Sequence, residues 1–193
     1  MSIYEVHTVE TAPEASKPLL RNLKGTIGMI PNLAASMSES PELLNGFLTI
    51  REIFYGGSFT PGEVQVLALT NAYENGCHYC MAFHSAFALK EGISKDAVDA
   101  LRAGRSPQEP TLRALSEFSR ALVKHRGHVG GDDVRRFIAA GFSKGQALEV
   151  VLGIAVSILA NFAHHITQCP LDGVFSAHML TTTDADAPSA QPA

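Results

Sequence analysis

The chain has 193 residues, of which 46% are hydrophobic, and its mean hydropathy is +0.08. A chain of this length and composition can bury a core of its own and fits one domain. Its formal charge is −4 at pH 7, and its Lys and Arg residues are scattered singly or in short pairs. The sequence thus lacks the basic footprint of a nucleic-acid-binding protein, and we expect no nucleic-acid partner.

The sequence also predicts a soluble, cytoplasmic protein without a membrane partner. The segment MSIYEVHTVE lacks the basic and apolar regions of a secretory signal. The longest apolar run, VVLGIAVSILA at 150–160, is shorter than the roughly 18 residues that a membrane span requires. We therefore expect it to be a buried core helix. In a reducing cytosol, two nearby cysteines are more often redox-active or metal-binding than a structural disulfide.

Helix signals occur along most of the chain, and nothing resembles a set of strands. Thr60 and Glu63 form a capping-box pattern, as do Ser143 and Gln146, and each pattern marks a helix start. Apolar residues at helical spacing and Gly or Pro stops set the other limits. Together these signals predict helices over residues 41–55, 60–75, 76–92, 94–103, 111–126, 132–141, 144–167 and 171–179.

The predicted fold class is therefore all-α, a bundle of roughly seven to nine helices. We expect residues 1–180 to form a single helical domain that contains a redox hairpin at about 60–103. The last stretch, TTTDADAPSAQPA at 181–193, lacks apolar content and is expected to be a disordered tail.

The segment ENGCHYCMAFHS at 74–85 carries two of the three cysteines. On a helix that advances about 100° per residue, Cys77, Cys80 and His84 fall within an arc of about 60°. The cysteines would lie in the first turn, where free N–H groups and the helix dipole stabilise a thiolate. His84, one turn after Cys80, is placed to take or hold the thiol proton. The pattern favours the redox chemistry of a dithiol.

Two other interpretations of this cluster stay open on the sequence alone. The cysteines and the histidine could be buried packing residues. They could also bind zinc, but structural zinc sites take four ligands, and no second CxxC or His-x₃₋₅-His group outside this cluster completes such a set. We therefore predict neither a metal nor a bound organic cofactor.

The segment NAYENGCHYCMAFHSAFALKEGIS, preceded by a capped helix, resembles the core motif of the alkylhydroperoxidase D-like proteins in the carboxymuconolactone decarboxylase superfamily. PNLAASMSESPELLNGF and NFAHHITQCPLDGVF resemble further segments of a branch of that superfamily. The resemblance thus covers most of the chain. It implies an all-helical fold and a homo-oligomer, either a trimer or a hexamer.

The resemblance also implies a thiol-dependent peroxidase activity. Cys80 would attack a hydroperoxide and become a sulfenic acid, and Cys77 would resolve it as a disulfide. His84 would help to deprotonate the attacking thiol. An external dithiol partner, a lipoyl or thioredoxin-like protein, would then reduce the disulfide. These steps agree with thiol chemistry, because a neighbouring thiol prevents over-oxidation.

Two positions depart from the pattern of the characterised hydroperoxidases. These enzymes have a glutamate twelve residues before the first cysteine, where this chain has Gln65, and an amide cannot accept the proton. They also have a histidine before the second cysteine, where this chain has Tyr79. Glu74, one turn before Cys77, is a nearby acid that would handle the proton or lie exposed at the helix end.

An Asn-x-x-x-His pair of the similar branch corresponds to Asn161 and His165. Two roles stay open for this pair: helix-end polar groups that satisfy the backbone, or, for His165, a group that faces the dithiol pocket. The activity also keeps two alternatives, a cysteine-independent lyase and a non-catalytic redox-sensing or assembly module. The lyase would stay active without its cysteines, whereas the peroxidase would not.

Overall fold

The structure is a computed structural model that describes residues 2–179. Those residues form nine α-helices and two 3-10 helices and contain no strand, which confirms the all-α class. The tail expected at 181–193 lies outside the described residues. In chain order the elements are η1 (Glu14–Ser16), α1 (Lys17–Ile27), α2 (Asn32–Met37), α3 (Pro41–Tyr55), α4 (Pro61–Glu74), α5 (His78–Lys90), α6 (Lys95–Arg102), α7 (Pro110–Lys124), α8 (Gly131–Ala139), α9 (Lys144–Thr167) and η2 (Gly173–His178).

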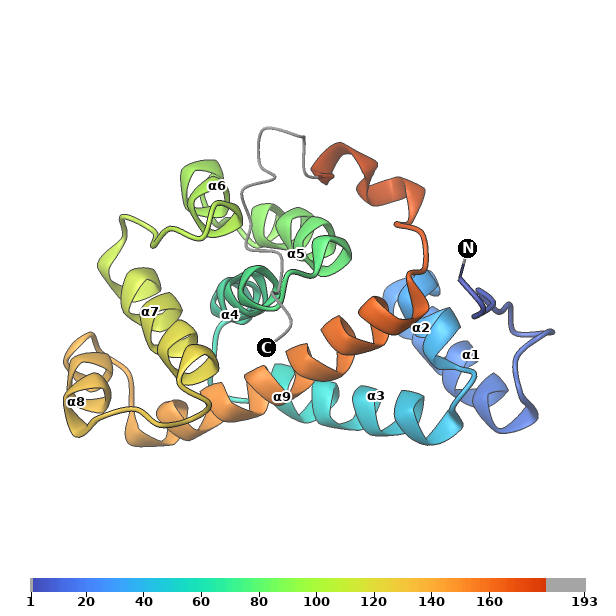
Figure 1. Cartoon of the computed structure of the whole chain (residues 1–193), viewed down its shortest axis with the longest axis horizontal. Coiled ribbons are helices and arrows are strands. Elements are labelled where there is room, and N and C mark those ends of the chain that lie inside the picture. The colour runs from blue at the N-terminus through green and yellow to red at the C-terminus, as the bar shows by residue number, and fades with distance from the viewer. Residues whose placement is uncertain (1, 180–193) are drawn as a thin grey trace.

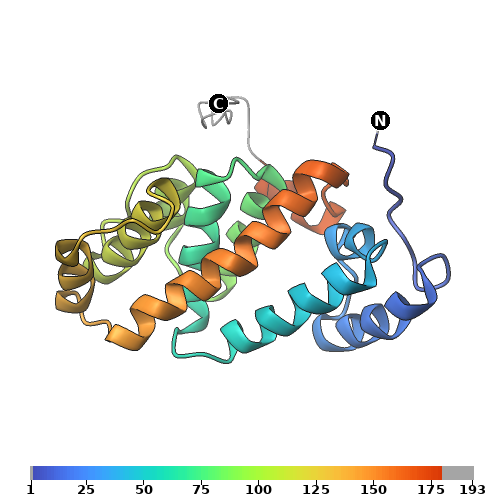
Figure 2. The same ribbon diagram turned by 60° about the horizontal axis from the view of Figure 1, so that its bottom comes forward.

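The helices form an elongated bundle whose two ends are connected by α9 (Figure 1). α1 and α2 lie at one end, and α7 and α8 lie at the other. α3 packs alongside α9, as both views show (Figures 1 and 2). The α4–α5 hairpin lies between the two ends, where α4 packs against α5, α7 and α9. The bundle thus surrounds the hairpin that carries the cysteines.

α4 is the central helix of the core. Every residue from Val64 to Ala72 is buried, because α5, α6, α7 and α9 pack around it. A helix that is apolar on all sides requires such surroundings. Its start is the predicted capping box: the Glu63 N–H donates to Thr60 Oγ1 at 3.3 Å, and the Thr60 N–H donates to Glu63 Oε2 at 2.8 Å. This prediction is confirmed.

α9 spans 144–167, as predicted, and begins with the capping box of Ser143 and Gln146. Taken as a whole, α9 is long and apolar enough to cross a membrane, and no other helix within residues 2–179 is. One such helix is weak evidence for a span, because core helices of soluble proteins have the same composition. The shorter apolar run at 150–160, taken alone, did not indicate this property of the whole helix.

A glycine allows α3 and α9 to approach each other closely. A Cβ at Gly153 would lie 2.7 Å from Cζ of the Phe54 ring. Carbon atoms do not approach to this distance, so a larger residue would displace either the ring or the helix. Gly153 and Phe54 both line the central cavity, and the shape of that cavity therefore depends on this contact.

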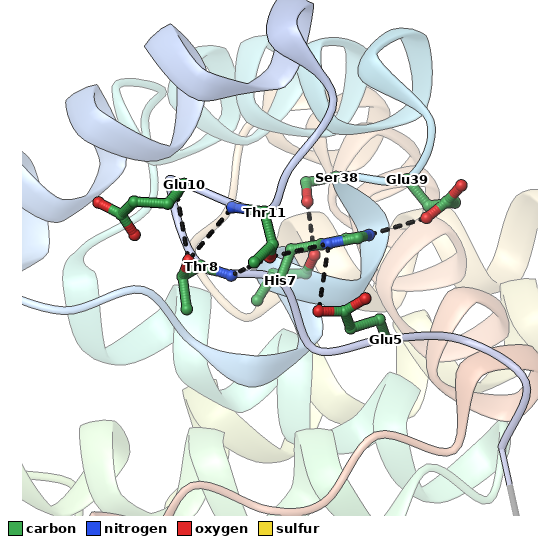
Figure 3. Close-up of polar contacts among 8 residues, drawn as sticks. Glu5, His7, Thr8, Glu10, Thr11, Ser38 and Glu39 are labelled. Atoms are coloured by element: carbon green, nitrogen blue, oxygen red, sulfur yellow. Dashed lines mark hydrogen bonds and ion pairs between the residues drawn. The ribbon is translucent and has the colours of Figure 1, made fainter.

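The N-terminal segment is held in place by a buried histidine. His7 Nε2 lies 2.8 Å from Glu39 Oε2, and His7 Nδ1 lies 3.2 Å from Thr11 Oγ1 (Figure 3). Nearby, the Ser16 hydroxyl donates to the Ser38 carbonyl at 2.6 Å. These contacts fix the segment before α1 against the turn between α2 and α3. The sequence patterns predicted neither α1 nor α2, yet both helices contribute walls of the central cavity.

Candidate active site

The α4–α5 hairpin places both cysteines at the start of α5. Gly76 turns the chain after α4 with a φ of +66°, a conformation that residues with side chains adopt rarely. Cys77 is the N-cap of α5, and its Sγ accepts a hydrogen bond from the Cys80 N–H at 3.4 Å. The predicted helix is confirmed, with Cys77 one residue before its first turn and Cys80 within that turn.

The two thiols differ in their ionisation. A hydrogen bond from the Cys80 thiol is the largest influence on Cys77 and lowers its pKa from 9.0 to about 5, helped by His164 and opposed by burial. The same hydrogen bond, burial and the Cys77 charge raise the pKa of Cys80 well above its ordinary value. At neutral pH the pair therefore holds one proton, on Cys80. The resting thiolate lies on Cys77, to which the family resemblance gave the resolving role.

Cys80 borders a cavity enclosed by α1, α2, α3, α4, α5 and α9. The cavity has a volume of about 80 Å³, and most of the side chains around it are apolar. Cys80 and His84 belong to its lining, whereas Cys77 does not. Cys80 is therefore the sulfur that a molecule in the cavity would meet, and Cys77 stands beside it as a charged neighbour.

Asn161 reaches Cys80 from α9. Its side-chain oxygen accepts a hydrogen bond from Asn75 Nδ2 at 2.8 Å, which leaves the Asn161 amide nitrogen free to donate elsewhere. The interaction of Asn161 with Cys80 partly counters the rise in the pKa of that thiol. Asn161 is buried and lines the cavity, so this predicted helix-end residue lies at the dithiol itself.

His84 and Gln65 form a hydrogen-bonded pair across α4 and α5. His84 Nδ1 lies 2.8 Å from Gln65 Oε1, so the ring donates from Nδ1 and keeps its lone pair on Nε2. Burial, and then the charge of Arg51, lower the pKa of His84 to about 3. The imidazole is thus neutral at physiological pH. The structure brings these two predicted residues together, with the amide orienting the ring.

Tyr79 is held by hydrogen bonds that fix its position. Its hydroxyl donates to Asp172 Oδ2 at 2.5 Å and accepts from the Leu33 N–H at 3.3 Å. Asp172 also accepts from the Asn32 N–H at 3.0 Å, so Tyr79 joins α5 to α2 and to the segment after α9. Burial and Asp172 raise the pKa of Tyr79 above its ordinary value. The tyrosine lines the cavity as a protonated, anchored side chain.

Glu74 is engaged away from the cavity. Its carboxylate accepts from Arg120 Nε at 2.6 Å and lies 3.7 Å from Lys124 Nζ, both on α7. The side chain is only 5% exposed, so neither the expected exposure at a helix end nor a place at the dithiol is observed. The carboxylate instead joins α4 to α7 as a buried ion pair.

Of the two roles left open for His165, a place facing the dithiol pocket is not observed, because His165 lies on the exposed side of α9. Its neighbour His164 takes that place. The His164 ring centroid lies 5.1 Å from that of Tyr79, and His164 helps to lower the pKa of Cys77. Positions three and four after Asn161 both lie near the asparagine on a helix, on opposite sides of it, so spacing alone does not select between His164 and His165.

Sequence reasoning also missed the basic residue of the cavity. Arg51, on α3, lines the cavity, and its guanidinium carbon lies 4.2 Å from the centre of the Tyr55 ring. Apolar spacing predicted this helix, but nothing in the sequence placed its one cavity-lining arginine opposite α5. Within residues 2–179, no three His, Cys, Asp or Glu side chains converge in a metal-binding arrangement.

The central helices of the chain match a known protein family. Residues 41–128, which include both cysteines, His84, Gln65 and Arg51, match the profile of the Carboxymuconolactone decarboxylase family. Residues 41–128 thus form a region of this family. Comparison with curated protein sequences finds no match. The site of this chain therefore combines a dithiol from the matched region with Asn161 and His164 from outside it.

Three solved structures share the fold of this chain. An alkylhydroperoxidase AhpD core protein, a peroxidase-related protein from Ralstonia eutropha, has a TM-score of 0.80 and 19% identity over 90% of this chain and 94% of its own. A peroxidase-related protein from Silicibacter has a TM-score of 0.75 and 15% identity, covering 90% and 93%. The debrominase Bmp8, a variant of which was crystallised with 2,3,4-tribromopyrrole, has a TM-score of 0.74 and 18% identity, covering 92% and 96%.

Proposed function

We propose that this protein is a thiol-dependent peroxidase that reduces hydroperoxides through a dithiol–disulfide cycle of Cys77 and Cys80. The observation that carries the proposal is the arrangement of the pair. The Cys80 sulfur borders an apolar cavity, and the thiolate of Cys77 accepts a hydrogen bond from it. A nucleophile, a proton acceptor and a resolving thiol thus lie within one turn of helix.

The first half of the cycle oxidises Cys80. As the Cys80 sulfur attacks the terminal oxygen of the hydroperoxide R–O–O–H, its proton passes by way of the Cys77 sulfur to the departing alkoxide. The O–O bond breaks, Cys80 becomes a sulfenic acid, the alkoxide leaves as an alcohol, and Cys77 is again a thiolate. Cys77 thereby performs the proton transfer that Gln65, as an amide, does not.

The second half closes the disulfide. The Cys77 thiolate attacks the sulfur of the Cys80 sulfenic acid, and the hydroxide that leaves takes a proton from solvent and becomes water. His84, whose Nε2 keeps a lone pair, would accept a hydrogen bond from the hydroperoxide O–H and orient it. An external dithiol, such as a lipoyl or thioredoxin-like protein of the cytoplasm, returns the disulfide to the dithiol.

We also propose that the protein acts as a homo-oligomer, a trimer or a hexamer. An exposed apolar stripe on α9 supports this: Leu148, Val151, Phe162 and Ile166 are between 51% and 75% exposed. Contiguous exposed apolar residues mark interaction surfaces. Light scattering should therefore find at least three copies of the wild-type chain, and Phe162→Glu should give smaller species. A monomeric wild type would contradict this part of the proposal.

Thiol counting after peroxide treatment tests the proposed activity. The reduced wild type should lose the thiols of Cys77 and Cys80 and retain that of Cys169, while Cys77→Ser and Cys80→Ser should each abolish turnover with a dithiol reductant. Cys169→Ser is the matched control, because burial raises the pKa of Cys169 to about 11 and keeps it protonated. Unchanged thiols after peroxide would refute the proposal. A lyase activity that persists in both serine variants would favour the lyase alternative.

A further inference from the structure

The cavity beside Cys80 contains one cation without a protein counter-ion. Arg51 lines the cavity among apolar side chains from several helices. In the part of the chain that the structure describes, no carboxylate lies within ion-pair distance of its guanidinium, and its recorded contact is with the ring of Tyr55. A guanidinium beside an apolar surface is stabilised when an anion pairs with it.

The other polar side chains of the cavity already have partners. Tyr79 forms a hydrogen bond with Asp172, His84 forms one with Gln65, and Asn161 forms one with Asn75. Ser157 accepts from Asn71 Nδ2 at 3.1 Å and donates to the Gly153 carbonyl at 2.9 Å. No acidic residue lines the cavity. Besides the lone pair on His84 Nε2, the cavity therefore offers a ligand the guanidinium of Arg51, a charged group with no carboxylate partner among the described residues.

Arg51 also lies close to the reacting groups. Its charge is one of the two causes that lower the pKa of His84, so the guanidinium acts on the ring that borders Cys80. A ligand that pairs with Arg51 would therefore have its remaining atoms in the space beside Cys80. Guanidinium groups bind carboxylates through two parallel hydrogen bonds, which fixes orientation as well as position.

The size of the cavity limits the apolar part of such a ligand. Each water-sized group requires about 10–15 Å³, so a cavity of about 80 Å³ accommodates roughly five to eight such groups. This space suits a short aliphatic chain or a single ring. Its apolar walls favour the burial of CH₂ or aromatic groups over polar ones.

We infer that the ligand of this cavity is a small apolar molecule with one carboxylate, which Arg51 binds while the apolar body extends towards Cys80. Together with the proposed function, on which this step rests, the substrate is a carboxylated hydroperoxide. Arg51 then acts as a specificity-determining residue: it binds the end of the substrate that does not react.

Calorimetric titration of the reduced protein with unreactive probes tests this inference without any turnover. Octanoate should bind the wild type, whereas octanol and octylamine should bind on the order of ten- to a hundredfold more weakly, as expected for loss of a hydrogen bond to a charged group. Arg51→Gln should remove the preference for octanoate, and Arg51→Lys should keep part of it. Arg135→Gln, which changes an exposed ion pair with Asp132, is the matched control and should keep the preference.

The outcomes separate this inference from the proposed peroxidase. Equal binding of octanoate and octanol to the wild type, no binding of octanoate, or a preference that persists in a folded Arg51→Gln variant would overturn the role of Arg51. The wild-type comparison stands even if the variant does not fold. Octanoate binding through Arg51 without any hydroperoxide turnover would leave this inference intact and refute the peroxidase. Turnover with equal kcat/KM for a carboxylated hydroperoxide and its methyl ester would support the peroxidase and refute the role of Arg51.

Discussion

Replacing Cys80 by alanine removes the largest influence on the Cys77 pKa, the hydrogen bond from the Cys80 thiol. A hydrogen bond to a charged group contributes about 1.5–3 kcal/mol. Because one pKa unit corresponds to about 1.36 kcal/mol, the midpoint of Cys77 should rise by about one to two units, from about 5 to about 6–7. His164 and the residue 80 N–H still stabilise the thiolate, so the pKa should remain below its ordinary value.

The ultraviolet absorbance of thiolates, followed in the reduced protein as pH rises, measures this midpoint. The low midpoint should be present in the wild type and in Cys169→Ser, shifted upwards in Cys80→Ala and absent from Cys77→Ser. A low midpoint that persists in Cys77→Ser would place the thiolate on Cys80 instead. An unshifted midpoint in Cys80→Ala would show that the two thiols do not share the proton.

Three further substitutions test other contacts of the site. Gln65→Glu places a carboxylate beside His84 Nδ1 and should raise the pKa of His84 from about 3 by about one to three units. Histidine NMR titration measures this shift, and Gln146→Glu is a distant control. An unchanged His84 pKa would contradict the pairing of His84 with residue 65. Tyr79→Phe leaves the buried Asp172 carboxylate with one donor fewer and should lower the free energy of unfolding by about 1–3 kcal/mol in urea denaturation; a loss near zero would show that the hydroxyl is dispensable. Gly153→Ala should lower the free energy of unfolding by about 1–3 kcal/mol through its clash with Phe54. Gly46→Ala, on α3 with no neighbour within 4 Å, should raise it by about 0.5–1 kcal/mol. Equal effects of the two substitutions would refute the role of the close contact.

The helices that begin with local chemistry were predictable from the sequence. The capping boxes at Thr60 and Ser143 depend on residues only three positions apart, so they could be identified without knowledge of the fold. The shared position of Cys77 and Cys80 at the start of α5 has the same local origin. α1 and α2 lack a side-chain cap hydrogen bond, and they were missed.

The parts of the site that depend on packing could not be predicted. His164 and His165 are adjacent in sequence, and only the rotation of α9 against α5 decides which ring faces the dithiol. Side chains from six helices, α3 among them, line the cavity, so no local pattern identifies Arg51. The assignment of the thiolate to Cys77 depends on whether Cys77 is the N-cap of α5 or its first residue. Sequence patterns do not place a helix boundary to within one residue.

Mass spectrometry of Cys77→Ser, treated with one equivalent of hydroperoxide in the presence of dimedone, tests the central proposal most directly. The substitution removes both the resolving thiol and the proton acceptor, but it also removes the Cys77 charge that raises the pKa of Cys80. The sulfenic acid should therefore form more slowly than in the wild type, persist and be trapped as an adduct on Cys80, while the wild type should yield the Cys77–Cys80 disulfide. In the Cys80→Ser variant no adduct should form on Cys77, which does not border the cavity. An adduct on Cys77 in that variant and none on Cys80 in Cys77→Ser would contradict the proposed order of attack.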